Sequence, residues 1–127
     1  MTDSAAAPAP LRVLLVDPDD RVRESLAGLL RIGERCLVVG TAGTADDAVL
    51  IATQSAPDVI VMDPRLPGQD GAALIARLRA AAPDSRVLVL AWTDADQATG
   101  ADAYARKTFR PHELIDAVVA ATRPSVA

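Results

Sequence analysis

A short apolar run that ends in a carboxylate constrains this chain more than any other feature. Val59–Met62 contains no polar residue, and Asp63 follows it directly, ahead of the turn-forming segment 64–71. A run without polar alternation is typical of a strand covered on both faces, as in a parallel sheet. An ionised carboxylate is tolerated there only where the strand emerges into a cleft. Asp63 is therefore a candidate nucleophile or metal ligand.

The remaining chain alternates between predicted strands and predicted helices. Strands are expected at 11–16, 36–40, 59–62, 86–91 and 103–106. Helices are expected at about 20–31, from the capping sequence at Thr44 towards Gln54, at 71–81 and from Pro111 onwards. Residues 93–99 leave room for about two helical turns at most, so the helix before the last strand should be short. This alternation predicts an α/β fold, a doubly wound five-stranded parallel sheet with helices on both faces.

Composition limits the domain organisation and the class of partner. The 127 residues correspond to about one domain. Residues 1–10 lack the features of a signal peptide or membrane span and are expected to be a disordered tail. The domain should cover 11–121, with 122–127 as a tail or the start of a linker. The net charge is −4 and no dense Lys/Arg cluster is present, so neither direct nucleic-acid binding nor membrane association is expected.

The two residue types that most often carry chemistry, cysteine and histidine, each occur once. Cys36 begins an apolar run and is expected to be a buried thiol in a cytoplasmic protein. His112 follows Pro111 at a helix start and is expected to be exposed. No Gly-rich phosphate loop, Ser/His/Asp arrangement or Cys/His metal spacing occurs, so a hydrolase or a cofactor-binding flavodoxin-like domain is poorly supported. We expect no enzymatic activity.

Charged residues follow three of the predicted strands. Ligands of open parallel sheets bind outside the carboxyl ends of the strands, where the strand order reverses. Asp17 comes after the first strand, Asp63 after the third and Lys107 after the fifth, while Ala91 and Trp92 lie at the end of the fourth. Two carboxylates and an ammonium group are therefore expected to converge at this edge of the sheet.

These stretches resemble the receiver domain of response regulators, the CheY-like module of two-component phosphorelay signalling. The resemblance covers about residues 11–121 and rests on residues 13–17, 21–26, 58–63, 66–68, 70–71 and 100–104, together with Lys107. It implies strand order 2-1-3-4-5 and a sensor histidine kinase as partner. The first helix most resembles receivers that precede a helix-turn-helix DNA-binding domain.

The resemblance also implies a role for individual residues. Asp63 would be the phosphoacceptor, and Asp17, Asp63 and the backbone carbonyl of Arg65 would be magnesium ligands. Lys107 would bridge to the aspartate or its phosphoryl group. The family's reaction is in-line attack of a carboxylate on a phosphoryl group, which depends on neutralising charge on the transferred oxygens.

The chain departs from the family pattern at the acidic pair, where Pro18 follows Asp17 and supplies neither a carboxylate nor an N–H. A magnesium ligand is therefore missing. Asp19 or Asp20 could move in as a substitute, or both could cap the first helix, which the positive end of the helix favours. Magnesium binding is expected to be weak or absent, with Lys107 alone balancing the two remaining carboxylates.

A second departure concerns the switch positions. Ala91 stands where the family usually has Thr or Ser. Trp92 follows it and could crowd the phosphorylation site, cover the cleft or pack on the short helix, and Thr93 could supply a displaced hydroxyl. Tyr104, the other switch position, is expected to be a half-buried core residue that is not coupled to the site, because position 91 has no hydroxyl.

Two functions remain open: an atypical receiver phosphorylated at Asp63, and a phosphorylation-independent pseudo-receiver that binds a protein partner or forms a homodimer.

Overall fold

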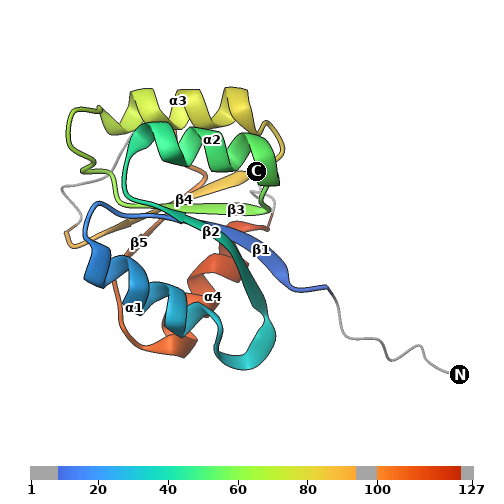
Figure 1. Ribbon diagram of the computed structural model, residues 1–127. Helices are drawn as coiled ribbons and strands as arrows, with labels where there is room; N and C mark the ends of the chain where they lie inside the picture. The colour runs from blue at the N-terminus through green and yellow to red at the C-terminus, as the bar shows by residue number, and fades with distance from the viewer. Residues whose placement is uncertain (1–8, 94–99, 124–127) are drawn as a thin grey trace, which may run out of the picture.

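The computed structural model describes residues 9–93 and 100–123, and in these ranges five parallel strands form one sheet (Figure 1). The strand order is β2-β1-β3-β4-β5, which confirms the predicted flavodoxin-like order. The order reverses between β1 and β3, so this is the position where a ligand site is expected. The strands are β1 Leu11–Val16, β2 Cys36–Ala42, β3 Val59–Met62, β4 Arg86–Ala91 and β5 Ala103–Arg106.

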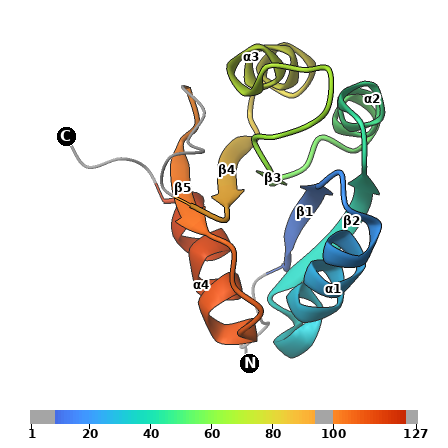
Figure 2. The ribbon, with the colours of Figure 1, turned by 90° about the vertical axis from the view of Figure 1, so that its left-hand side faces the viewer.

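Helices cover both faces of the sheet within the described ranges. Helices α2 and α3 lie on one face and α1 and α4 on the other, as Figures 1 and 2 show. The helices are α1 Asp20–Leu30, α2 Ala45–Ser55, α3 Gly71–Ala81 and α4 Pro111–Ala121, with a short 3₁₀ turn at Ile32–Glu34. The predicted short helix before β5 falls mainly within residues 94–99, outside the described residues, as do most of the two predicted tails.

Local sequence signals determine where most helices begin. Side chains of Asp19, Thr44 and Asp70 accept hydrogen bonds from backbone N–H groups in the first turns of α1, α2 and α3. These groups have no partner inside the helix, so a polar cap stabilises each start. Pro111 occupies the first turn of α4, where its missing N–H costs nothing.

Two element ends differ from expectation. The first helix ends one residue earlier than predicted, because the chain passes into the 3₁₀ turn, where Gly33 adopts a φ of 81°. Strand β2 extends two residues further, since Thr41 and Ala42 still pair with β1. Neither difference moves the carboxyl edge of the sheet.

The core consists of two apolar layers separated by the sheet. Alternate residues of the central strands face opposite layers: in β3, Ile60 and Met62 pack towards α2 and α3, whereas Val59 and Val61 pack towards α1 and α4. All four are fully buried. Because both faces of β3 are covered, the strand has no position for a polar side chain until it ends at Asp63.

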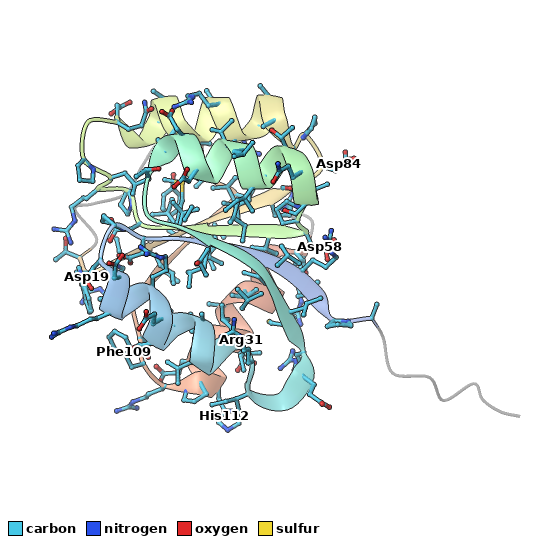
Figure 3. All side chains as sticks on the ribbon, in the orientation of Figure 1. Asp19, Arg31, Asp58, Asp84, Phe109 and His112 are labelled. Atoms are coloured by element: carbon cyan, nitrogen blue, oxygen red, sulfur yellow. The ribbon has the colours of Figure 1, made fainter. Side chains whose placement is uncertain are left out.

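The single cysteine and histidine lie where the sequence predicts. Cys36 is buried in the layer beneath α1 and α4. Burial raises the pKa of its thiol, although the positive charge of Arg35 opposes the shift. His112 is exposed in the first turn of α4 and points away from the molecule (Figure 3). No helix in the described ranges is both long enough and apolar enough to cross a membrane.

Candidate functional site

Backbone hydrogen bonds place Asp17, Asp63 and Lys107 at the same edge of the sheet. Each lies one residue beyond a strand and donates its N–H to the last carbonyl of the neighbouring strand, at 3.0 Å for Asp17, 2.9 Å for Asp63 and 2.9 Å for Lys107. The backbone hydrogen bonds of the sheet therefore continue into the site. Figure 3 shows Asp19 at this edge and Asp58, which precedes β3, at the opposite one.

The three side chains form a compact charged group, here called the ionic trio. The Nζ atom of Lys107 donates to Asp17 Oδ2 at 2.6 Å and to Asp63 Oδ2 at 2.5 Å. Exposure of the side chains is 2% for Lys107, 2% for Asp17 and 4% for Asp63. The trio carries two negative charges and one positive charge. One lysine thus bridges both carboxylates in a site that is almost closed to solvent.

The other two carboxylate oxygens are also hydrogen bonded to the protein. Asp17 Oδ1 accepts from the backbone N–H of Asp19 at 2.9 Å. Asp63 Oδ1 accepts from the backbone N–H of Arg65 at 2.7 Å, and the Arg65 guanidinium lies 3.9 Å away. All four carboxylate oxygens of the trio therefore have a protein donor.

This arrangement does not fit a preformed magnesium site. Magnesium requires near-octahedral oxygen coordination at short distance. Among the residues that the structure describes, two carboxylates converge here, residue 18 is proline, and each oxygen of the two carboxylates already accepts a hydrogen bond. Within residues 9–93 and 100–123, no three His, Cys, Asp or Glu side chains are grouped to hold a metal ion. The assignment of the Arg65 carbonyl as a ligand stays a prediction.

Asp19 and Asp20 take the helix-terminal positions rather than the missing acidic position. Asp19 caps α1 by accepting from the N–H groups of Arg21 and Val22 at 2.9 and 3.0 Å. The bond from Val22 is the main reason that the pKa of Asp19 is lowered. Asp20 is exposed and pairs with Arg23 at 2.5 Å. The capping alternative is thus confirmed for Asp19.

Arg23 holds the loop that carries Asp17, a contact that sequence reasoning missed. Its Nη1 atom donates to the backbone carbonyl of Asp17 at 2.7 Å. The guanidinium passes beside Gly43, where an added Cβ would lie 2.8 Å from Nη1. Gly43 therefore leaves the space that this contact needs. The matching stretch 21–26 contains Arg23, but nothing local indicates this role.

One aromatic side chain covers the lysine of the trio, and a second contacts the first. The ring of Trp92 lies over Lys107, with 4.9 Å between Nζ and the ring centroid. Phe109 contacts Trp92 in a tilted arrangement, with 5.9 Å between centroids. Trp92 also lines the cleft, as one of its alternatives predicted, whereas packing on the short helix concerns residues 94–99, outside the described residues. Phe109 was not expected at the site; its place just after Lys107 is the only sequence signal that would have found it.

The two switch positions differ in their surroundings. Ala91 is buried and brings no hydroxyl to the site. Tyr104 is 40% exposed and belongs to neither apolar layer, so the prediction was wrong in placing this half-buried side chain in the core. Ala103 and Ala105 take the inward positions of β5, and the two-residue period of a strand turns Tyr104 to the other face. Strand β5 is also an edge strand, with only β4 beside it.

A cleft of about 420 Å³ opens above the trio. Pro18, Asp19, Val22, Arg65 and Trp92 line it together with the three charged residues. A phosphoryl group entering this cleft would meet a carboxylate nucleophile and a lysine that can neutralise its oxygens. The chemistry that suits this arrangement is acceptance of a phosphoryl group on an aspartate.

A flavodoxin-like sheet with two carboxylates and a lysine at its carboxyl edge is typical of CheY-like signalling domains. The chain belongs to the response regulator receiver domain family, whose model matches residues 13–119. It is therefore a receiver domain of two-component signalling. Receiver domains of this family are typically non-enzymatic.

Several sequence relatives are transcriptional regulators. The transcriptional regulatory protein LiaR of Bacillus subtilis is 33% identical over 119 residues, which is 89% of this chain and 56% of LiaR. The DNA-binding transcriptional activator DevR/DosR of Mycobacterium tuberculosis is 36% identical over 114 residues, 85% of this chain and 52% of the relative. The chain thus spans about half the length of these curated relatives.

Solved receiver structures have the same fold. The signal receiver domain of the response regulator NarL from Mycobacterium tuberculosis superposes with a TM-score of 0.79 at 27% identity, covering 91% of this chain and 98% of that one. The response regulator domain of Thermotoga maritima CheB gives a TM-score of 0.76 at 26% identity, covering 92% and 99%.

Proposed function

We propose that this chain is an atypical receiver domain in which Asp63 accepts a phosphoryl group in a pocket with impaired magnesium and switch sites. The observation that carries this proposal is the ionic trio, in which Lys107 bridges Asp17 and Asp63 at 2.6 and 2.5 Å. The nucleophile is present at the base of a cleft, and the amino group of Lys107 lies beside it. The family assigns the same roles to residues at these positions.

The reaction proposed is transfer from a phosphohistidine of a sensor histidine kinase. A carboxylate oxygen of Asp63 forms the new P–O bond while the P–N bond to histidine breaks, and the histidine nitrogen keeps the electron pair and takes a proton from solvent. The Lys107 ammonium can exchange its contact with the Asp63 carboxylate for a contact with the oxygens of the transferred phosphoryl group. The product is an aspartyl phosphate whose added negative charge changes the surface around the cleft.

Transfer should be slow compared with an ordinary receiver. Fewer groups neutralise the transferred oxygens, because Pro18 supplies no carboxylate and Ala91 supplies no hydroxyl. Magnesium would have to compete with Lys107 for Asp17 and Asp63, so we infer weak magnesium affinity. Each lost stabilising group lowers the rate of a reaction that depends on positioning and charge.

The output is proposed to be a change in association, with a protein partner or a second copy of the chain. The chain itself carries a net negative charge and is not proposed to bind nucleic acid or to act as an enzyme. Since the match covers only 52% of a relative that is a DNA-binding transcriptional activator, a helix-turn-helix domain following the receiver is part of the proposal. A cytoplasmic location fits this role.

A second candidate function is a phosphorylation-independent pseudo-receiver that binds a protein partner. The observation that favours it is that all four carboxylate oxygens of the trio are already hydrogen bonded by the protein. Such a pocket needs neither metal nor phosphate to be stable. The missing hydroxyl at Ala91 points in the same direction.

Intact-protein mass spectrometry after incubation with acetyl phosphate and magnesium distinguishes the two candidates. We expect wild type to gain one phosphoryl group slowly, and the Asp63→Asn variant, which keeps the size of the side chain but loses the nucleophile, to gain none. An ordinary receiver treated in parallel shows that the conditions suffice. If wild type stays unmodified while that receiver reacts, the pseudo-receiver function replaces the proposal.

A magnesium titration followed by calorimetry tests the second half of the proposal. Binding weaker than that of an ordinary receiver measured beside it is expected. Affinity equal to that of the ordinary receiver measured beside it would contradict an impaired metal site, whatever the phosphorylation result.

A further inference from the structure

We propose that Trp92 is a positioning residue that holds Lys107 between Asp17 and Asp63 and so keeps divalent cations out of the pocket. This inference rests on the proposed function, because it explains how the pocket stays closed to magnesium. The inference assigns a role to the aromatic ring of Trp92. The loss of the second acidic residue at Pro18 does not by itself give this ring a role.

The argument begins with the hydrogen-bonding capacity of the lysine. An ammonium group has three N–H donors and no acceptor. Two partners of Lys107 are the carboxylates of Asp17 and Asp63. The third side of the ammonium faces the ring of Trp92, whose centroid lies 4.9 Å from Nζ. A cation within about 6 Å of an indole face is attracted to the electron density of the ring.

Burial shows that the ring also acts as a cover. Trp92 itself is 43% exposed, whereas the side chain beneath it is only 2% exposed. The Trp92 ring is therefore in contact with water on its outer side and with the Lys107 ammonium on its inner side. The ring takes the place of water that would otherwise solvate this ammonium. Shielding from water strengthens the attraction of the lysine to both carboxylates.

Phe109 supports the position of Trp92. The chain has only three aromatic residues, and two of them meet here, with ring centroids 5.9 Å apart. Phe109 follows Lys107 by two residues, so the segment that delivers the ammonium also delivers the ring that contacts Trp92. Offset or tilted aromatic pairs of this separation are stabilising.

A divalent cation that binds the Oδ2 atoms of both Asp17 and Asp63 must take the position between them that the Lys107 ammonium occupies. Any group that stabilises Lys107 in place therefore weakens cation binding by the same factor. A cation–π contact contributes a factor of roughly 3 to 30 between exposed and desolvated sites. Removing the ring should raise magnesium affinity by a factor in that range while the two carboxylates stay intact.

The experiment compares three proteins: wild type, Trp92→Leu, which removes the aromatic face, and Trp92→Phe, which keeps an aromatic face of smaller size. Magnesium affinity is measured by calorimetry. The ¹⁵N-detected NMR signal of the Lys107 ammonium, assigned with Lys107→Met, reports hydrogen exchange without any metal present. Phe109→Leu serves as an intermediate variant that removes only the supporting ring.

We expect Trp92→Leu to bind magnesium roughly 3- to 30-fold more tightly and to exchange its Lys107 ammonium protons faster. Trp92→Phe should stay near wild type, and Phe109→Leu should shift in the direction of Trp92→Leu. Equal affinities in wild type and Trp92→Leu, or no detectable binding in any of the proteins, would overturn the inference. An equal gain in magnesium affinity in Trp92→Leu and Trp92→Phe would also overturn it, because the smaller size of the side chain, and not the loss of the aromatic face, would then explain the gain.

The failure of this inference and that of the proposed function are separate results. The inference depends on the ratio between variants and on the ammonium exchange rate. The proposed function depends on the absolute magnesium affinity and phosphorylation of wild type. Both would be refuted if wild type bound magnesium with ordinary affinity and the Trp92 variants bound it as tightly as wild type does.

Discussion

Replacement of Lys107 by methionine tests the central physical claim, that the trio is a buried and mutually dependent charged group. Methionine keeps most of the side-chain volume but removes the cation. Asp17 and Asp63, exposed by 2% and 4%, would then face each other without compensation. Removing one partner from a buried ion pair typically costs about 3–5 kcal/mol.

The geometry supports the same magnitude independently. Both Oδ2 atoms lie within 2.6 Å of one nitrogen, so they are at most about 5 Å apart. Two like charges at about 5 Å repel by about 3 kcal/mol at an effective dielectric constant of about 20. Lys107→Met should therefore lower the free energy of unfolding by about 3–5 kcal/mol, a large part of the ~5–15 kcal/mol typical of a domain.

Urea denaturation at pH 7 measures this loss, and a second substitution shows its cause. Adding Asp63→Asn to Lys107→Met removes one of the two uncompensated charges, so the double variant should be more stable than the single one. That reversal keeps the test valid even if Lys107→Met hardly folds. Arg35→Met, which breaks an exposed ion pair with Asp116, is the matched control and should cost less than about 1 kcal/mol.

Two results would refute the reasoning. A loss below about 1 kcal/mol for Lys107→Met would mean that water solvates the carboxylates as well as the lysine does. Failure of Asp63→Asn to restore stability would mean that the loss comes from packing rather than charge.

Two further predictions concern the scaffold around the site. Gly28 is exposed near the end of α1 with nothing within 4 Å of an added Cβ, so Gly28→Ala should raise the free energy of unfolding by about 0.5–1 kcal/mol, measured by urea denaturation. Gly40→Ala should lower the free energy of unfolding, because its Cβ would lie 2.7 Å from Ile51; equal effects of the two substitutions would contradict the packing in β2. The pKa of Asp19 is lowered by the backbone N–H groups that it caps, so its stabilising effect is present above about pH 4 and is lost as the pH falls through the lowered value. Thermal melts in acid should therefore show wild type losing stability relative to Asp19→Asn, which caps without a charge; parallel curves would contradict the assignment.

The strands and helices were predictable because their signals are local. The unbroken apolar run at Val59–Met62 requires cover on both faces, and the structure has helices on both. Caps at Thr44 and Asp70 precede helices that begin at the next residue. The alternation of these elements leaves few topologies, and the observed strand order is the expected one. The convergence of Asp17, Asp63 and Lys107 followed from the rule for the carboxyl ends of parallel strands.

Contacts between side chains were beyond local reasoning. Lys107 is 90 residues from Asp17 in the chain and 44 from Asp63, yet one nitrogen contacts both. The exposure of Tyr104 depends on which face of an edge strand it occupies. The contact of Phe109 with Trp92 depends on the direction that the chain takes after β5 ends. Neither property is visible in a window of sequence, because each depends on strand register and side-chain rotamer.

The sequence by itself determined the fold, the family and the three charged residues of the site, because hydrophobic period, caps and strand ends are written in consecutive residues. Only the tertiary structure decided that the lysine satisfies both carboxylates, that Asp19 caps a helix instead of replacing the missing acid, and that Trp92 covers the ammonium. The physical reason is that charge balance and burial are properties of groups brought within a few ångströms of each other by distant segments. A residue's type says what it can bind, and the packed sheet decides what it does bind.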